Sequence, residues 1–387
     1  MMTQTIALLV DAYRELCAKK LFWITMILSV LVVLIFAMVG INTEGMTFLT
    51  WQLPADFNGV TITSETMSPG LLYRTMFASL AVPIWLSWVA VILGLISTAG
   101  MIPDLIQGGT IESTLSRPIG RVRLLLTKFV GGLLFMTLQV FVFSLLVFLV
   151  IGIRGKSWAP EVFIAVPVVV AMFSYLFAVC VLLGLVTRST IAALLLTLLF
   201  WMIVFVVNTG DGIAVSIHER IKAEQRVEIA RVERMERNGT LLLLEQTNDE
   251  RELDGLPPLE GLETAPTEQQ LNELDLRLPA ARVRVEELEQ SEQLADTWRS
   301  LIYLGKSILP KTQETIGLLE RWTVDREALQ SLGGTPEDED RRIQREAQQA
   351  TADAIGNRPL WWVLGTSFFY EAFVLGLAAV IFKRRDF

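Results

Sequence analysis

Two Gly-Lys-Ser triplets look like the end of a nucleotide-binding loop. They are Gly155-Lys156-Ser157 and Gly305-Lys306-Ser307. A phosphate-binding loop also needs a glycine five positions before its second glycine, because the backbone N–H groups of that turn cradle the phosphates. Val150 and Ser300 stand at those positions. Neither triplet therefore predicts a site at which this chain binds ATP.

Other catalytic centres find little support in the sequence. His218 is the one histidine, so we expect neither a zinc site nor a histidine-based triad. The patterns G-x-S-x-G, H-E-x-x-H and C-x-x-C are absent from the chain. Cys17 and Cys180 lie in different apolar segments, which implies no disulfide framework. We therefore predict no catalytic residues, no metal ligands and no enzyme activity in this chain.

A polar run from Asp104 to Lys128, DLIQGGTIESTLSRPIGRVRLLLTK, separates two long apolar stretches. After the glycine pair at 108–109, Thr110 can cap a short helix whose first turn holds Glu112. Pro118 ends that helix, because the residue before a proline is driven out of the α region. Three basic residues follow at the mouth of the next apolar stretch: Arg121, Arg123 and Lys128. The run indicates a turn, a short helix, a proline stop and a basic anchor at a membrane surface. On these residues alone an ordinary cytoplasmic loop between two membrane helices is the favoured interpretation, since basic loops are the default on the inner face.

Apolar blocks dominate the rest of the chain. Of its 387 residues, 52% are hydrophobic, and these residues are clustered. About 20 apolar residues are enough for a helix to cross the hydrocarbon core. Six stretches meet that length: 21–40, 79–102, 124–151, 161–186, 190–208 and 360–382. We predict an all-α integral membrane protein with six transmembrane helices.

Residues 1–20 before the first span form an amphipathic pattern. Ile6, Leu9 and Tyr13 fall on one helical face, while charged residues such as Asp11 and Lys19 lie largely on the other. A helix of this kind can lie in the membrane interface. A cleaved signal peptide is the alternative, but no small-residue cleavage site follows the apolar run.

The basic residues in short loops predict the orientation. Ten of them lie at the ends that we assign to the cytoplasm: Lys19, Lys20, Arg117, Arg121, Arg123, Lys128, Arg188, Lys383, Arg384 and Arg385. The opposite short loops hold three: Arg74, Arg154 and Lys156. This asymmetry follows the positive-inside rule and places both termini in the cytoplasm. The connection 42–74 is then an extracytoplasmic loop rich in Thr, Pro and Gly.

The insert 209–357 must then lie outside the membrane on the extracytoplasmic side. It is rich in charged residues and glutamine, and it predicts mainly helices. One runs from about 212 to 237 and ends at Asn238-Gly239, and a second runs from about 279 to 309, which together could form an antiparallel hairpin. A third begins at the cap Thr335 and ends at Gly356. The charges of the insert suit a solvated surface, or a docking face for a periplasmic partner.

Two polar residues lie inside predicted spans, Gln139 in the third and Glu371 in the sixth. A carboxylate in hydrocarbon costs several kcal/mol unless it faces a cavity or a partner. Both are candidates for a translocation path across the membrane. The alternatives are a helix–helix hydrogen bond for Gln139 and a structural pair with a basic or hydroxyl group for Glu371.

The run GGTIESTLSRPIGRVRLLLTK resembles the signature loop of type-2 ABC exporter permeases. The matching positions are Gly109, Thr110, Ile111, Glu112, Leu115, Ser116, Pro118, Ile119, Arg121 and Lys128. In that family this loop is the coupling helix, which docks into a groove on the ATP-hydrolysing subunit. The specific match covers about 25 residues, and the order of the spans extends it weakly to most of the chain but not to the insert. Within the family, the chain looks most like permeases grouped with multi-copper enzyme maturation.

The resemblance implies a transport subunit without cofactors of its own. It implies two copies of an ATPase subunit that bind ATP and Mg²⁺, a second permease copy or a homologous permease, a bilayer around the spans, and no nucleic acid. It implies coupling to the ATPase through Gly109, Thr110, Ile111, Glu112, Leu115, Pro118 and Arg121. The protein would export a substrate across the cytoplasmic membrane.

A membrane-anchored structural or sensory protein is the other function class that we weighed. In that case the extracytoplasmic helical domain would act and the spans would only anchor it, although six spans are more than an anchor needs. In either case we expect four parts. They are an amphipathic elbow helix (1–20), spans one to five with the cytoplasmic coupling loop 104–123 (21–208), the extracytoplasmic domain (209–357), and the sixth span with its basic tail (358–387).

Overall fold

The computed structural model describes residues 14, 20–49, 51–53, 56–57, 60–61, 63–65, 67–107, 120–262, 264–323 and 339–384. Within these residues, six helices are long and apolar enough to cross a membrane, judged by length and composition. The prediction of a mainly helical protein with six long apolar helices is therefore confirmed. The elbow helix predicted over residues 1–20 falls outside the described residues, apart from Arg14 and Lys20.

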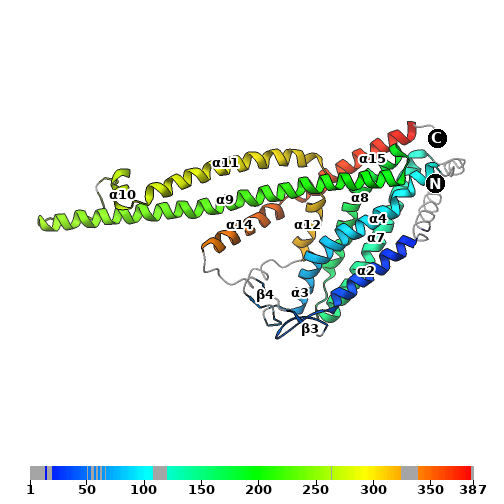
Figure 1. The fold of residues 1–387 in the computed structure, drawn as a ribbon, viewed down its shortest axis with the longest axis horizontal. Helices are drawn as coiled ribbons and strands as arrows, with labels where there is room; N and C mark the ends of the chain where they lie inside the picture. Colours follow the sequence, from blue (N-terminus) through cyan, green and yellow to red (C-terminus); the bar gives the residue numbers. More distant parts are fainter. Residues whose placement is uncertain are drawn as a thin grey trace. The chain divides into compact units, whose positions relative to one another are not determined.

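The spans are built from the following elements (Figure 1). The first is α2 (Lys20–Met38), and the second joins α3 (Pro69–Met76), the π-helix η1 (Phe77–Ala90), α4 (Val91–Thr98), η2 (Ala99–Met101) and α5 (Pro103–Gln107). The third is α7 (Arg121–Arg154), and the fourth joins η3 (Pro160–Ile164) and α8 (Ala165–Thr187). The fifth is the first part of α9 (Thr190–Leu253), and the sixth joins η4 (Trp361–Gly365) and α15 (Thr366–Arg384).

The second span begins earlier than the sequence predicted. We expected it to start at 79, but α3 begins at Pro69, and the Ser68 hydroxyl accepts a hydrogen bond from the Leu71 backbone N–H at 3.3 Å. Ser followed by Pro is a helix start signal. The serine oxygen accepts a hydrogen bond from a free backbone N–H of the first turn, and proline at the first helical position has no N–H that would need a partner. Pro83 lies within the π-helix η1.

The loop expected after the first span contains short strands, which the sequence analysis missed. The strands β1 (Val39–Asn42), β2 (Gly45–Phe48) and β3 (Trp51–Leu53) form an antiparallel sheet, with Gly40 opposite Thr47 and Thr47 opposite Gln52. The strands β4 (Asp56–Phe57) and β5 (Val60–Thr61) form a second antiparallel pair. Gly45 has a φ of 142°, which only glycine adopts readily, and it closes the tight turn between β1 and β2.

The chain divides into two compact units. Unit 1 consists of residues 1–208, 305–335 and 358–387, and unit 2 consists of residues 209–304 and 336–357. The insert that we expected as one domain over 209–357 therefore splits, because residues 305–335 group with the spans. Their described helix, α12 (Thr312–Thr323), packs against α8, η1, η3 and η4 within unit 1.

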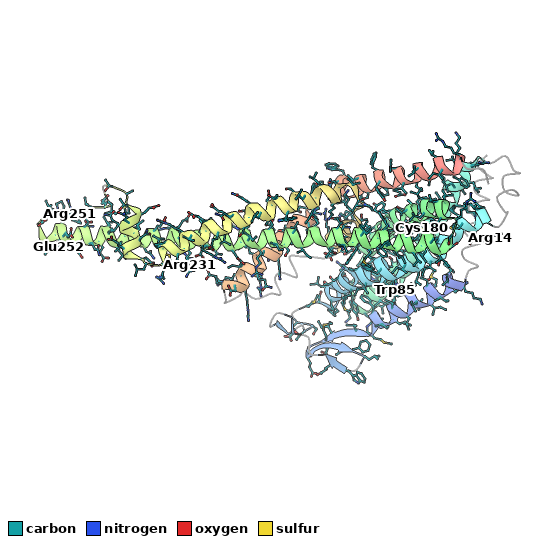
Figure 2. The ribbon with its side chains drawn as sticks, turned by 45° about the horizontal axis from the view of Figure 1, so that its top comes forward. Arg14, Trp85, Cys180, Arg231, Arg251 and Glu252 are labelled. Carbon is teal, nitrogen blue, oxygen red and sulfur yellow. The ribbon has the colours of Figure 1, made fainter. Side chains whose placement is uncertain are left out.

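The most buried span of unit 1 is α8, which packs against α7, α12 and α15. The rings of Phe129 and Phe177 stack at 5.2 Å between α7 and α8. A Cβ on Gly132 would lie 2.5 Å from the Phe177 ring, so only glycine fits where the two helices meet. Small residues at such contacts let membrane helices approach closely. Cys180, labelled in Figure 2, is buried in this packed core as a free thiol.

Unit 2 is built from the second part of α9 with α10 (Glu268–Leu274), α14 (Glu339–Gly356) and α11 (Leu278–Ile308), whose end returns to unit 1. Ion pairs join Glu236 to Arg282 at 2.7 Å and Lys222 to Glu292 at 3.9 Å. Their order shows that α9 and α11 run antiparallel, side by side (Figure 1). The helix predicted over 279–309 and the helix end at Gly356 are thus found, whereas the start at Thr335 lies outside the described residues.

Asn238-Gly239 does not end a helix, so that prediction is wrong. The helix α9 continues without a break from Thr190 to Leu253. A Cβ on Gly239 would lie 2.8 Å from the Leu271 side chain of α10. This glycine provides close contact between two helices rather than a cap. Charged side chains such as Arg231, Arg251 and Glu252 lie on the same helix, before and after Gly239 (Figure 2).

Candidate functional site

The predicted coupling residues lie almost entirely outside the described part of the chain. Gly109, Thr110, Ile111, Glu112, Leu115 and Pro118 are among residues 108–119, which the structure does not describe. Arg121 is described, as the first residue of α7. Its guanidinium donates a hydrogen bond to the backbone carbonyl of Lys383 at 3.4 Å. The start of the third span therefore lies beside the end of the sixth.

Asp104, which lies shortly before residues 108–119, is also held by a neighbouring element. The Thr190 hydroxyl, at the start of α9, lies 3.4 Å from Oδ1 of Asp104 in α5 and donates a hydrogen bond to it. A Cβ on Gly184 of α8 would be 3.3 Å from Pro103. The described residues on the two sides of 108–119 thus lie beside the turn between α8 and α9 and beside the last turn of α15. We call this end of unit 1 the Lys383 end.

The other end of unit 1 is held by contacts around Tyr73. Its hydroxyl donates a hydrogen bond to the Val39 carbonyl and accepts one from Nε of Arg154 at 3.0 Å. Arg74 donates a hydrogen bond to the Ser157 hydroxyl at 2.9 Å. The end of α2, the start of α3 and the end of α7 therefore meet here, at what we call the Tyr73 end.

Glu371, one of the two predicted path residues, is engaged inside the chain. Its side chain is 9% exposed, and its Oε2 accepts a hydrogen bond from the Ser174 hydroxyl of α8 at 2.7 Å. The contact joins α15 to α8. This is the kind of partner that a polar side chain needs in an apolar bundle, since an unpaired one costs free energy.

Gln139, the other predicted path residue, has no such partner. It is 1% exposed on α7, and neither its amide nitrogen nor its amide oxygen has a hydrogen-bond partner among the described residues. Burying an amide without hydrogen bonds costs free energy. The described part of the chain contains no hydrogen bond between Gln139 and Glu371.

A buried ionic cluster on α12 is a feature that the sequence analysis missed. Oε1 of Glu314 is 2.6 Å from the Arg358 guanidinium and also pairs with the Lys306 ammonium. The Glu314 and Lys306 side chains are each 3% exposed. Carboxylates and ammonium groups are almost never fully buried unless they are paired. We call Lys306, Glu314 and Arg358 the α12 ionic cluster.

Lys311 extends this cluster toward the sixth span. Its side chain is 0% exposed, its Nζ donates to the Ser307 carbonyl at 2.8 Å, and it lies 5.0 Å from the centre of the Trp362 ring. Its backbone N–H donates to the Ser367 hydroxyl at 3.0 Å. Burial lowers the pKa of Lys311 to about 8, because desolvation disfavours the charged form.

The α12 ionic cluster lies where the separate chain segments of unit 1 begin or end. Lys306 is the second residue of the segment 305–335, and Arg358 is the first residue of the segment 358–387. Asn208, the last residue of the segment 1–208, donates a hydrogen bond to the Thr312 hydroxyl of α12 at 3.3 Å. The first turns of α12 thus hold three separate stretches of the chain together.

The sequence contained a weak signal for this cluster. Lys306 belongs to one of the two Gly-Lys-Ser triplets that failed the nucleotide-binding test, and Pro310 separates it from an amphipathic stretch that begins at Thr312. The charges of residues 209–357 were interpreted as a solvated surface. Lys306 and Glu314 depart from that interpretation, because their side chains are buried and paired.

A comparison with protein families gave a match over most of the chain. The family model described as "ABC-2 family transporter protein" matches residues 13–309, which is more than half of the chain. This range contains five of the six spans and the segment 108–119. No curated protein and no solved structure matches the chain.

Proposed function

The chain belongs to the ABC-2 family of transporter proteins and is a permease, the membrane subunit of such a transporter; on this basis we propose that residues 104–123 couple it to an ATPase. The chain itself is not the catalytic subunit, since members of this family are permeases. The family also decides between the two function classes considered from the sequence, in favour of transport over a mere membrane anchor.

The position of the segment supports the coupling proposal. Asp104 and Arg121, which lie on the two sides of residues 108–119, are fixed at the Lys383 end of unit 1. A force on the segment is therefore delivered to α5 and α7 directly, and its flanks contact α9 and α15. Ile111 and Leu115 are four residues apart and share one face of the short helix that the sequence predicts. They are the anchors that we propose for a groove on the ATPase.

The orientation is part of the same proposal. Among the described residues, Lys20, Arg121, Arg123, Arg188, Lys383 and Arg384 lie at the Lys383 end, and the positive-inside rule places such basic residues in the cytoplasm. Both termini would then be cytoplasmic, in the cytoplasmic membrane, and an ATPase could reach residues 104–123 from that side. The Tyr73 end, the strands β1–β5 and unit 2 would be extracytoplasmic.

We further propose the composition of the whole transporter. Two ATPase copies would bind ATP and Mg²⁺, and a second copy of this permease or a homologous one would complete the membrane part. The direction would be export. The finer similarity to permeases grouped with multi-copper enzyme maturation rests on the sequence resemblance and belongs to this proposal.

The domain division of the chain is proposed on the same footing. The elbow helix would occupy residues 1–20, spans one to five residues 21–208, and the sixth span with its tail residues 358–387. An extracytoplasmic domain within 209–357 is supported by unit 2 for residues 209–304 and 336–357. Residues 305–323 would instead brace the Tyr73 end, since α12 packs against η1, η3 and η4 there.

Cross-linking would test the coupling proposal. A photoreactive amino acid placed at Ile111 in the full transporter should cross-link to the ATPase that copurifies with the tagged chain. The same reagent at Trp51, which is 76% exposed and adjoins the Tyr73 end, should not. Equal cross-linking from both positions, or none from Ile111, would contradict the proposal.

A further inference from the structure

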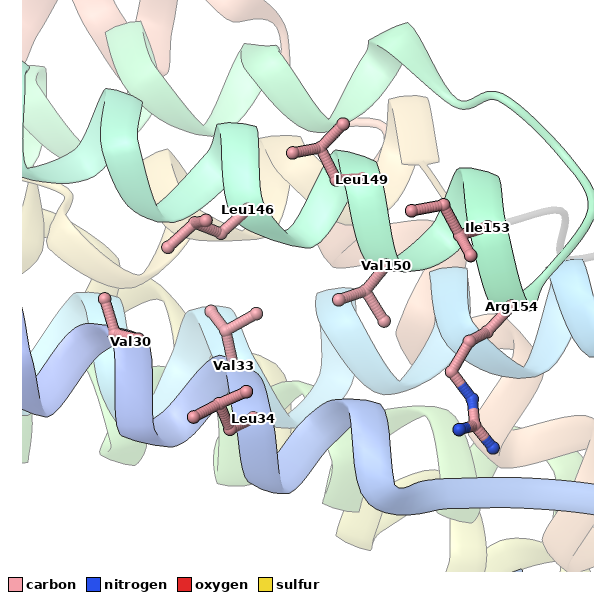
Figure 3. A pocket seen from close by; sticks show the side chains of 8 residues that line it. All are labelled: Val30, Val33, Leu34, Leu146, Leu149, Val150, Ile153 and Arg154. Atoms are coloured by element: carbon pink, nitrogen blue, oxygen red, sulfur yellow. The ribbon is translucent and has the colours of Figure 1, made fainter.

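An apolar groove lies between the first and third spans, toward the Tyr73 end of unit 1. Figure 3 shows seven aliphatic side chains and one arginine around it. They come from α2 (Val30, Val33 and Leu34) and from α7 (Leu146, Leu149, Val150, Ile153 and Arg154). The cavity measures about 290 Å³. Its size is comparable to that of small-molecule sites.

The groove opens on the outer surface of the bundle. Leu34 is 53% exposed and Ile153 is 71% exposed, whereas Val33 is 5% exposed and forms part of the floor. Among the described residues that line it, Arg154 carries the polar side chain. An exposed aliphatic surface on two membrane spans faces lipid hydrocarbon, because the bilayer core holds no water and aliphatic side chains offer water no hydrogen-bond partner.

Arg154 gives the groove a charged end. It is the last residue of α7, and its Nε is oriented by the Tyr73 hydroxyl at 3.0 Å, which is itself held by the Val39 carbonyl. Among the described residues we find no carboxylate paired with Arg154. Its terminal nitrogens therefore sit at the edge of an apolar groove, in a place fixed by other residues.

We propose that this groove binds one acyl chain of a phospholipid, with the lipid phosphate on Arg154. An arginine at the membrane surface attracts anionic headgroups, and its planar guanidinium matches the geometry of a phosphate. The stretch from Leu146 to Ile153 rises about 10 Å along α7, which follows part of an acyl chain. This lipid site is independent of the coupling proposed above.

A second copy of the chain is the competing occupant of the groove. An apolar helix from another copy would cover the aliphatic side chains, but it would also bury Arg154 without a counter-charge. Burying an unpaired charge is costly, whereas a phosphate at the same place compensates it. The charge at the end of the groove therefore favours a phospholipid over a protein helix.

Lipid binding by the purified full chain tests the proposal. Native mass spectrometry would measure retention of dioleoyl-phosphatidylglycerol and of dioleoylglycerol, which has the same chains but no phosphate. Arg154→Gln should weaken phosphatidylglycerol binding about five-fold, the effect expected for one arginine near the membrane surface, and leave dioleoylglycerol unchanged. Val150→Trp should fill the groove and abolish tight binding of both lipids.

Two control variants accompany these measurements. Arg123→Gln removes a basic residue near the start of α7, and Leu199→Trp adds a bulky ring on α9, where Leu199 is 58% exposed. Both should bind lipid as the unaltered chain does. Unchanged lipid binding in Val150→Trp or in Arg154→Gln would overturn the proposal. The proposal would also be overturned if Val150→Trp lost self-association but still bound lipid. That result would show that a second copy of the chain, and not a lipid, occupies the groove.

Discussion

Glu314 and Arg358, which are separated by 44 positions in the sequence, form an ion pair at 2.6 Å. Glu314 belongs to α12, and Arg358 lies shortly before Trp361, where the sixth span begins. Lys306, at the end of α11, shares the same carboxylate oxygen. The pair thus fixes the start of the sixth span to the helix that packs against α8. We expect this cluster to stabilise unit 1 strongly and to be sensitive to substitution.

Glu314→Ala should destabilise the protein by about 3–5 kcal/mol, the usual cost of removing one partner from a buried ion pair. Lys306 and Arg358 would both lose this partner. The matched control is Glu346→Ala in unit 2, which breaks an exposed pair with Arg226 at 2.9 Å and should cost less than about 1 kcal/mol. Thermal unfolding in detergent measures both. Equal losses in the two variants would show that the cluster contributes no more than a surface pair.

The stability should depend on pH through Lys311. Its folded-state pKa, about 8, lies below its ordinary value of 10.5, so between these values the folded protein binds fewer protons than the unfolded chain. The free energy of unfolding therefore rises with pH across this window. Lys311→Met should remove that contribution, so its melting temperature should rise less than that of the unaltered protein between pH 8 and 10.5. Parallel pH curves for the two proteins would contradict the assignment.

Glu371 should need an acceptor of similar shape. Glu371→Gln keeps an oxygen for the Ser174 hydroxyl, so stability should change little. Glu371→Leu removes this hydrogen bond and leaves the Ser174 hydroxyl the Ala171 carbonyl at 2.7 Å as its acceptor, so it should cost about 0.5–1.5 kcal/mol. Thermal unfolding and transport-coupled ATPase activity are measured for both variants. If Glu371→Leu is as stable and as active as the unaltered protein, the carboxylate has neither a structural nor a transport role.

Thiol labelling tests the orientation. Single cysteines at Thr3 and at Ser291, which is exposed on α11, would be introduced into a chain lacking Cys17 and Cys180. In intact cells, an impermeant thiol reagent should label the cysteine at 291 and not the one at 3. Permeabilised cells serve as the control, since both positions should then react. Labelling at 3 but not at 291 would reverse the proposed topology.

Local sequence patterns were enough to predict the spans. Continuous apolar stretches of about 20 residues have few structural alternatives, and all six were found as long apolar helices. The helix expected over about 279–309 and its antiparallel hairpin with α9 also followed from local composition. These features are determined by residues that are close to one another in the sequence, so they can be predicted from it.

Contacts between distant residues explain what the sequence did not predict. Gly239 looked like a helix end, but its role is to let Leu271 approach α9. Glu314 looked like one more surface charge, but Arg358 and Lys306 reach it only in the folded chain. Ser174 could not be named as the partner of Glu371, because 197 positions separate them.

Retention of the ATPase by variants of residues 104–123 tests the coupling proposal most directly. A buried apolar anchor typically contributes about 2 kcal/mol or more to such a contact, and a charge at its rim less than about 1 kcal/mol. Leu115→Asp should therefore release the ATPase from the detergent-solubilised complex, while Arg123→Gln should retain it. Pull-down through a tag on the permease, at equal expression and correct insertion, gives the result. Full retention of the ATPase, with transport-coupled turnover intact, in Leu115→Asp would contradict the account.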